Sequence, residues 1–477
     1  MKRISLTLLL SGAFLIGIAQ DVWDLRRCVD FAIANNIQVR QNQVQEQVAD
    51  VNVKQGNASR FPTLNFQTSS GGQFGRSIDP ATNLFTTNSI TFINNGLSTN
   101  VTLFNWFSIK NQVEATRLTA EATRAQTEVI RNDISLNVAA AYLQALLSHE
   151  QMRIAKVQVD QTMEQLAITR KRVDAGALPE LNAAELSAQL ARDSATFVAA
   201  QSQFELNQLS IKAILNLDAA ASFRIAVPPA DLIPVEPIAD LQPELVFSKA
   251  VAQQPRQRAN QLRLEAAIKT TASARGALYP TISAFGNLQT AYSSALESLP
   301  KGQNITSVFQ TQSFVNVSGS NYFVNTPVTR PESFVAANVW RQFDFNRRQS
   351  IGLGLSVPIF NGLQARSGYQ RAKLNESTIQ LQMLADTLQL KQDIYQAYQS
   401  AVNTLNTFNS RQRSVETADY SYSLGLKRYE VGFLPVLELV TLQNNLQRAR
   451  IEKASAQYEY IFRLKVLEFY KNNSIKL

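Results

Sequence analysis

Two long segments of the chain repeat apolar residues in steps of three and four positions. In the first segment, from about residue 107 to 174, the apolar positions are Leu118, Ala122, Ala125, Val129, Leu136, Ala139, Leu143 and Leu146. In the second segment they are Leu381, Leu384, Leu388, Tyr395, Tyr398, Val402 and Leu405. This spacing predicts coiled-coil helices. The first helix would be about 100 Å long, which is more than a compact domain requires.

Each of these helices ends in a similar short motif. Residues 171–179 read KRVDAGALP, and residues 427–435 read KRYEVGFLP. A glycine can adopt a positive φ and end a helix, and a proline fits the first turn of the helix that follows. We therefore expect two αα-hairpins, with returning helices at about 181–217 and 436–470.

Four shorter segments alternate apolar and small polar residues, which is typical of β-strands with one apolar face. The alternating positions are Leu64, Phe66 and Thr68 in the first segment, Leu97, Thr99, Val101 and Leu103 in the second, and Leu353, Leu355, Val357 and Ile359 in the fourth. The third begins at Tyr279-Pro280-Thr281-Ile282, which matches Phe61-Pro62-Thr63-Leu64. Helical spacing also covers residues 22–60, ahead of the first strand.

The second half of the chain repeats the organisation of the first. Ala32-Ile33-Ala34-Asn35-Asn36 matches Ala250-Val251-Ala252-Gln253-Gln254 at the offset that relates the two strand starts. We predict a first repeat at 20–240, with a helix, two strands at about 61–104, a helical hairpin at about 107–217 and a proline-rich linker. A second repeat at 241–477 would contain a helix, two strands at about 280–360 and a hairpin at about 363–472. The extra residues of its long loop, at about 293–350, would form either a surface epitope or a plug.

The N-terminus has the pattern of a secretory signal peptide. Lys2 and Arg3 precede a short apolar run, and small residues end near Ala19. We therefore expect residues 1–19 to be a signal peptide. An N-terminal membrane anchor is the alternative, although the apolar run is shorter than the ~20 residues of a membrane span.

The four strands have the alternating pattern of an outer-membrane barrel, but four strands cannot close one. An open sheet edge in lipid would leave backbone groups unpaired at a high energetic cost. Several copies of the chain would therefore have to share a barrel. A soluble four-stranded sheet is the alternative, and the long helices and the signal peptide favour the membrane interpretation.

Composition excludes several classes of function. The net charge is +9, but the basic residues are scattered, so we expect no nucleic-acid binding. The single cysteine, Cys28, and the single histidine, His149, lie within helical patterns and are interpreted as structural. They are too few for a zinc site or a Cys–His pair, so we expect no enzyme activity, no metal and no cofactor. A periplasmic tether or adaptor is the alternative to a channel.

Together these features resemble the TolC family of outer-membrane efflux and export channels. The resemblance covers nearly all of the chain after residue 19 and depends on the order and spacing of the repeated elements. The motifs that carry it are Trp23-Asp24-Leu25, the two strand starts, Phe104-Asn105, Phe360-Asn361 and the paired tips. The family implies a mainly α fold with a small β part. A trimeric, 12-stranded outer-membrane β-barrel with four strands per chain would be continuous with a long periplasmic α-helical coiled-coil barrel.

The resemblance also implies a function and partners. The chain would be a homotrimer in the outer membrane of a Gram-negative bacterium, in contact with lipid and extending into the periplasm. It would be the passive conduit of a tripartite efflux or type I secretion system. A periplasmic adaptor and an inner-membrane pump or ABC exporter would open it. The cargo, whether drug, metal ion or protein, stays open.

The resemblance further indicates site residues. In the family, acidic residues just past the second tip ring the tunnel constriction; Glu438 matches the first such position, and Thr441 departs from the pattern at the second. The periplasmic gate would then have one ring of carboxylates, unless Glu438 only complements the dipole of its helix. We expect the tips to contact the adaptor because exposed apolar residues there indicate a partner surface, although glycine and proline could simply form the turns. These tip residues are Arg172, Gly176, Leu178, Pro179, Arg428, Gly432, Leu434 and Pro435.

Overall fold

The computed structural model describes residues 22–78, 83–86, 89–230, 233 and 235–473. The predicted signal peptide, residues 1–19, lies outside this part of the chain. The described residues form two compact units. The first unit contains residues up to 51, 117–266 and from 376 onward, and the second contains 52–116 and 267–375. Each unit combines segments of both predicted repeats.

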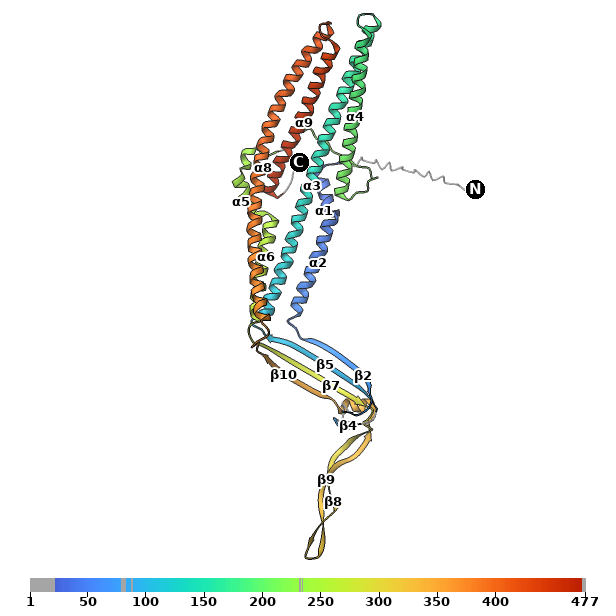
Figure 1. Cartoon of the computed structure of the whole chain (residues 1–477), viewed down its shortest axis with the longest axis vertical. Coiled ribbons are helices and arrows are strands. Elements are labelled where there is room, and N and C mark those ends of the chain that lie inside the picture. The colour runs from blue at the N-terminus through green and yellow to red at the C-terminus, as the bar shows by residue number, and fades with distance from the viewer. Residues whose placement is uncertain (1–21, 79–82, 87–88, 231–232, 234, 474–477) are drawn as a thin grey trace, which may run out of the picture. The chain divides into compact units, whose positions relative to one another are not determined.

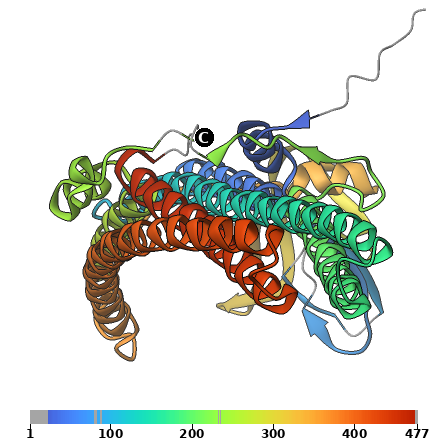
Figure 2. The ribbon, with the colours of Figure 1, turned by 90° about the horizontal axis from the view of Figure 1, so that it is seen from above.

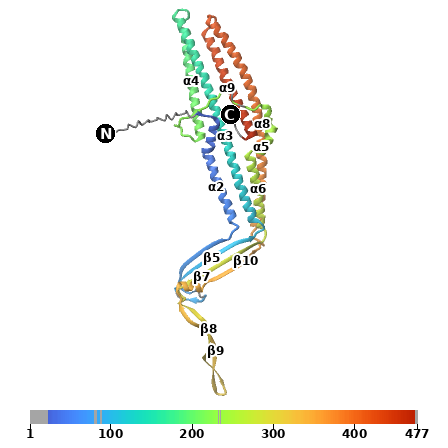
Figure 3. The ribbon, with the colours of Figure 1, turned by 180° about the vertical axis from the view of Figure 1, so that it is seen from behind.

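Four long helices provide most of the first unit. α3 (Ser108–Asp174) and α4 (Glu180–Leu215) form one hairpin, and α8 (Gln364–Glu430) and α9 (Val436–Asn472) form the other. This agrees with the two αα-hairpins expected from the sequence, and α3 and α8 are both 67 residues long. Figures 1 and 3 show the two helices of each hairpin side by side, and Figure 2 views them from the tips. No helix in the described part combines the length and apolar character that a membrane span needs.

The segment predicted to be helical at 22–60 forms two helices, because the chain turns at Asn36. The helices on either side are α1 (Leu25–Asn35) and α2 (Ile37–Ala58), and their counterparts in the second repeat are α5 (Pro243–Gln253) and α6 (Pro255–Gly276). Asn36 has an extended ψ of 133°, and Gln254 has a ψ of 129°. Pro255 explains the second break, since a residue before proline avoids helical geometry. The side chain of Asn36 caps α2 by accepting from the Gln38 N–H at 2.8 Å.

The main core of the first unit encloses the start of the described chain. β1 (Val22–Trp23) pairs in parallel with β6 (Arg224–Ile225), which belongs to the linker after α4. The phenol of Tyr142 on α3 is 1% exposed, donates to the Ala226 carbonyl at 2.7 Å and lies 3.1 Å from the Trp23 carbonyl. The linker is therefore anchored to the helices, and it continues through a short 3-10 helix, η2 (Ile238–Leu241).

The second unit contains an antiparallel sheet with the strand order β10-β7-β5-β2. Its strands are β2 (Thr63–Gln73), β5 (Ile90–Phe104), β7 (Thr281–Ser293) and β10 (Arg348–Ser356). β3 (Ser77–Ile78) and β4 (Phe85–Thr86) form a small separate pair in the loop between β2 and β5. The four strands predicted from alternation therefore lie together in one sheet.

Leu103 lies in β5 as predicted, and the register between β5 and β7 shifts between Thr102 and Phe104, so that Phe104 pairs with Ile282. The predicted end of the fourth strand is wrong. Val357 and Ile359 lie beyond the end of β10. Pro358 stands between them, and a proline has no N–H to continue the pairing.

The two faces of the sheet differ in polarity, as the alternation predicts. One face presents apolar side chains to solvent, among them Leu64, Phe66, Ile351 and Leu353. The register puts Asn65 beside Ser98, and Ser98 beside Asn287, on the opposite face. A large apolar face that nothing in the described chain covers indicates a contact with lipid or protein.

The long loop of the second repeat forms a β-ribbon followed by a short helix. β8 (Ser298–Val317) pairs with β9 (Ser320–Ala336), and α7 (Val339–Phe345) leads into β10. Gln342 of α7 is fully buried; its side-chain amide lies 3.0 Å from the Ser293 and Ala337 carbonyls and 3.1 Å from that of Leu296. This residue fastens the base of the ribbon to the end of β7.

The heptad predicted for α8 is exposed in its first part. Leu381, Leu384 and Leu388 are 66%, 56% and 59% exposed, whereas Leu390 and Ile394 are 8% and 0% exposed. A different side of the helix therefore packs against α5 and α9. The exposed leucines form a second apolar stripe, which we call the α8 seam.

Candidate functional site

Both hairpin tips have the same backbone geometry. Gly176 and Gly432 have φ values of 70° and 82°. The N–H groups at the two turns close back onto the helix, from Gly176 to the Val173 carbonyl at 2.8 Å and from Gly432 to the Tyr429 carbonyl at 3.0 Å. A residue with a Cβ would be strained by about 1–2 kcal/mol in this left-handed conformation.

The prolines stand one residue earlier than predicted. Pro179 and Pro435 occupy the N-cap positions of α4 and α9, with ψ values of 147° and 149°, rather than the first turn. A proline cannot cap through its side chain, but its fixed φ directs the chain into the helix. The two turns therefore have a similar backbone conformation.

The tips of the two hairpins contact each other. The hydroxyl of Thr169 on α3 lies 2.9 Å from that of Tyr429 on α8, and both groups are buried. Arg172 donates to the Glu430 carbonyl at 3.2 Å. Two of the basic tip residues thus differ, because Arg172 is engaged in this contact and Arg428 is exposed.

The exposure expected of Leu434 is wrong. This side chain is 8% exposed and packs into a cluster with Leu166, Leu186, Tyr429 and Leu439, and Leu178 is half-buried. The apolar side chains that the second tip presents to solvent are Val431, Phe433 and Leu437, at 66%, 78% and 65% exposed. Sequence analysis missed these three, because periodicity alone does not show which side of a turn faces the neighbouring hairpin.

Glu438 and Thr441 lie on one side of the first turns of α9, and both are exposed. The Glu438 N–H donates to the Pro435 carbonyl at 3.2 Å, and the Thr441 hydroxyl donates to the Leu437 carbonyl at 2.9 Å. The bond of Glu438 is made by its backbone and that of Thr441 stays within the helix, and both side chains are exposed to solvent in the single chain. The gate role of Glu438 and Thr441 stays a prediction.

A buried polar network joins the two hairpins below the tips. Asp193 of α4 is 4% exposed and accepts from the Thr162 hydroxyl at 2.6 Å and from the Gln189 amide at 2.7 Å. Gln443 of α9 donates to the Thr162 oxygen at 3.0 Å. Gln189 also lies 3.0 Å from the Asn444 side-chain oxygen. This network links α3, α4 and α9.

Sequence analysis did not identify this network, although a signal was present. Leu186, Gln189 and Asp193 are three and four positions apart, so two polar residues occupy the buried stripe of α4. Polar groups in such a stripe are stable only when hydrogen-bonded. A survey of the heptad positions for misplaced polar residues would have marked this site.

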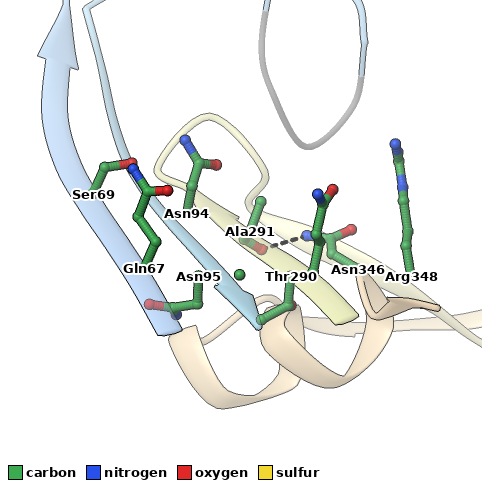
Figure 4. Close-up of a pocket in the computed structure, with 10 residues that line it drawn as sticks. Gln67, Ser69, Asn94, Asn95, Thr290, Ala291, Asn346 and Arg348 are labelled. Atoms are coloured by element: carbon green, nitrogen blue, oxygen red, sulfur yellow. Dashed lines mark hydrogen bonds between the residues drawn. The ribbon is translucent and has the colours of Figure 1, made fainter. Parts of the chain in front are cut away.

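The polar face of the sheet contains an open hollow of about 340 Å³. Figure 4 shows Gln67 and Ser69 from β2 and Asn94 from β5 along it, with Asn346 donating to the Ala291 carbonyl at 2.8 Å. Its lining is made of amides, hydroxyls and one cation, Arg348. Such a lining holds water and small polar solutes, and it includes none of the carboxylates, histidines or thiols that catalysis most often uses.

The two residues with reactive side chains serve packing. Cys28 is fully buried, and its burial raises the pKa of the thiol to about 12, so the thiolate form is suppressed. His149 packs edge-on against Phe204 at 5.1 Å, and burial lowers the pKa of its imidazole. In the described part of the chain, no three His, Cys, Asp or Glu side chains form a group that could hold a metal ion.

Comparison with known proteins gives agreement in sequence and fold. A family model described as outer membrane efflux protein matches residues 29–217 and 246–469. The chain is 21% identical over 358 residues to the pyoverdine export outer membrane protein OpmQ of Pseudomonas putida. That match covers 74% of this chain and 64% of OpmQ, so the chain spans less than two thirds of this relative.

Solved structures resemble the chain over most of its length. CusC has a TM-score of 0.72 at 16% identity, covering 93% of this chain and 91% of the CusC chain. The outer membrane protein VceC of Vibrio cholerae has a TM-score of 0.71 at 15% identity, covering 94% of this chain and 95% of its own. At such identities the likeness establishes the fold, which is mainly α with a small β part, as the sequence predicts.

Proposed function

Because this chain belongs to the outer membrane efflux protein family, we propose that it forms an outer-membrane channel through which an efflux or secretion system exports its cargo. The match confirms the membership in the outer-membrane efflux channel family that the sequence predicts. The observation that carries the proposed function is the sheet of the second unit. It has one exposed apolar face, one polar face, and a free outer edge on each of β2 and β10 within the described chain.

The polarity of the sheet suits a channel wall. Lipid would cover the face with Leu64, Phe66 and Ile351, and water and cargo would pass along the face with the amide-lined hollow. Backbone groups at a free edge cannot stay unpaired in lipid. The edges of β2 and β10 therefore pair with neighbouring copies, and three copies would supply the twelve strands expected for the family.

The α8 seam supports the same assembly. Leu381, Leu384 and Leu388 repeat at heptad spacing and are exposed in the single chain. A heptad stripe packs stably against another helix. The seam suits a helix of the neighbouring copy, so that the helices of three chains enclose a tunnel.

Export through such a channel requires a partner that supplies energy. The exposed tip residues Val431, Phe433 and Leu437 form an apolar patch at the second tip. We assign this patch, together with the two glycine–proline turns, to a periplasmic adaptor that connects the channel to an inner-membrane pump or ABC exporter. The cargo stays open.

The channel function is tested with the full-length protein in mild detergent and in planar bilayers. We expect a trimer by analytical ultracentrifugation, and discrete single-channel conductance after reconstitution. A monomer that inserts no channel, or a protein that stays monomeric in plain buffer without detergent, would overturn the proposal.

Glu438 is the candidate for ion selectivity at the periplasmic end. In a trimer its carboxylates would form one ring, which favours cations because like charges on the wall repel anions. We expect Glu438→Gln to lower the cation preference in bilayers, measured from the reversal potential in a salt gradient. Glu430→Gln, at the tip before α9, is the matched control. Equal reversal potentials in native protein and Glu438→Gln would remove Glu438 from the gate.

A further inference from the structure

Most of the β8–β9 ribbon is uncharged, and the ribbon has open edges. None of the residues from 302 to 329 is charged, although charged residues make up 17% of the whole chain. Ile305, Val308 and Phe309 on β8 are 51%, 70% and 57% exposed. In the described chain β8 and β9 form a sheet of two strands, so each strand has one free edge. Natural proteins usually protect such edges with charges or proline.

Prolines interrupt the β9 edge along the uncharged stretch, whereas the one proline of β8, Pro300, lies before that stretch, near the start of the strand. Pro327 lies opposite Val308, and Pro331 lies opposite Asn304. A proline within a paired strand must turn its nitrogen away from the partner strand, since it has no N–H to donate. The backbone nitrogens at these positions therefore point to the outer edge of β9, which consequently lacks two donors.

The register then identifies the donors on the outer edge of β8. In an antiparallel ladder, opposite residues alternate between inward and outward hydrogen-bonding groups. The positions that share the orientation of Pro327 and Pro331 are Asn304, Thr306, Val308 and Gln310 on β8. None of these is a proline, so from Asn304 to Gln310 this edge offers an uninterrupted row of N–H and C=O groups.

The tip of the ribbon supports this orientation. Ser318 and Gly319 have φ values of 52° and 88°, as in a two-residue hairpin turn. In such a hairpin the residues next to the turn, Val317 and Ser320, exchange hydrogen bonds. Counting back places Asn316 and Phe314 with outward groups, so the β8 edge is open near the tip as well.

We infer that this edge of β8 pairs antiparallel with β8 of a second copy of the chain, about a two-fold axis at Ser307. The pairing would set Thr306 opposite Val308 and Ile305 opposite Phe309 of the other copy. The outward positions then meet each other and would form about eight hydrogen bonds. A two-fold axis brings identical residues together, so the absence of charge in this stretch is what a contact between copies requires.

This inference rests on the proposed trimer and extends it. Three subunits related by a three-fold axis cannot all form this two-fold contact with one another. Pairing of β8 with β9 around one ring is disfavoured because Pro327 and Pro331 interrupt the β9 edge. Each β8 edge therefore pairs with a copy in another trimer, and the ribbons link channels side by side.

The test compares two variants in which a proline is placed at one of two positions that lie opposite each other in the ribbon. The hydroxyls of Thr306 and Thr329 lie 2.8 Å apart across the ribbon, so either substitution removes the same hydrogen bond. Thr306→Pro blocks the open β8 edge, and Thr329→Pro adds a proline to the edge already interrupted. Both positions have outward nitrogens, so the ribbon itself stays paired. The full-length protein is examined by sedimentation velocity in mild detergent.

We expect native protein and Thr329→Pro to form species larger than a trimer, and Thr306→Pro to weaken that association by about tenfold or more, because the central hydrogen bonds of the contact are lost. Slow amide exchange at Ser307 and Phe309 checks that the ribbon is intact. Equal association of the two variants, or native trimers that never associate, would overturn the inference and leave the channel intact. A native monomer would instead overturn the proposed trimer.

A charge pair distinguishes a second copy from a strand of another protein. Thr306→Lys should abolish association, because it sets two cations near the two-fold axis. Adding Val308→Glu in the same chain sets each lysine opposite a carboxylate of the other copy, and association should return. Failure of the double variant to restore it, with Thr306→Lys dissociated, would contradict pairing between copies and favour a foreign strand.

Discussion

Asp193 is a charged residue that is buried between helices. A carboxylate at 4% exposure would be unstable in an apolar helix interface without partners. Here it accepts from Thr162 and Gln189, and Gln443 extends the network to the second hairpin. The network therefore specifies how α9 packs against α3 and α4, which an apolar interface would define less sharply.

Removing this carboxylate should destabilise the helical unit. Asp193→Ala leaves the buried Thr162 hydroxyl and the Gln189 amide without their acceptor, at a cost of about 2–4 kcal/mol in the free energy of unfolding. Thermal unfolding followed by far-UV circular dichroism measures the loss. Glu205→Ala, an exposed position on the same helix, should change stability by less than about 0.5 kcal/mol. Equal midpoints for the two variants would show that the network contributes nothing.

The ion pair of Glu236 should make the free energy of unfolding depend on pH in the acid range. Lys471 donates to its carboxylate at 2.5 Å and lowers the pKa of Glu236 below its ordinary value of 4.5. A carboxyl group with a lowered pKa contributes stability that is complete above about pH 4.5 and is lost as the pH falls through the lowered value.

We expect Glu236→Gln to lower the midpoint of thermal unfolding at pH 7, and the difference from native protein should shrink as the pH falls below about 4.5. The Asn472 amide also donates to this carboxylate at 3.0 Å, and a glutamine keeps an acceptor for it. Midpoints that differ equally at pH 7 and pH 3 would contradict a contribution from the ion pair.

At the scale of elements, close approach of α8 and α9 depends on Gly425. A Cβ at this position would collide with the side chain of Leu442. Gly425→Ala should therefore cost about 1–3 kcal/mol by overpacking, and Leu442→Ala in the same chain should recover part of the loss. Gly368, on the same helix, has open space around its Cα, and Gly368→Ala should gain up to about 1 kcal/mol in helix propensity.

Chemical or thermal unfolding of the three variants measures these differences. A loss in Gly425→Ala that Leu442→Ala does not reduce would mean that the glycine serves backbone conformation rather than helix approach. Stabilisation by Gly425→Ala equal to that of Gly368→Ala would contradict the packing argument altogether.

The sequence predicted the long elements, in which the spacing of apolar residues repeats many times. It did not predict the elements whose structure depends on packing against other segments. The helices α3 and α8 are each 67 residues long, and they were predictable because the heptad spacing of apolar residues recurs along them. The break at Asn36 has no such signal, because its capping bond to Gln38 is available to any asparagine. The helix α7 depends on a single buried residue, Gln342, that no periodicity reveals.

The candidate site divides in the same way. The glycine–proline turns were predicted because backbone conformation restricts residue type directly. The burial of Leu434 and the exposure of Phe433 were not, since both follow from how one hairpin packs on the other. Pairing of Asp193 with Thr162 likewise joins residues that are distant in sequence, and a single sequence gives no measure of such pairs.

At the scale of the whole molecule, the α8 seam predicts how copies assemble. Leu384→Glu places a charge in an interface that buries leucines, and an unpaired buried charge is strongly unfavourable. We expect this variant to sediment as a monomer at concentrations where native protein is a trimer. Its helix content should be unchanged, because Leu384 is 56% exposed in the single chain.

Gln382→Glu is the matched control, since it adds the same charge at an exposed position of the same helix outside the seam. It should remain a trimer. A trimeric Leu384→Glu variant would mean that the seam faces solvent or another protein, and the strands alone would then have to account for assembly.

The equal lengths of α3 and α8 constrain how the two repeats can diverge. The bond between Thr169 and Tyr429 forms only if both helices carry these hydroxyls to the same level. One added heptad in α3 alone would offset them by about 10 Å. Insertions that lengthen such a protein must therefore occur in both repeats together. The length of one hairpin thus constrains the length of the other.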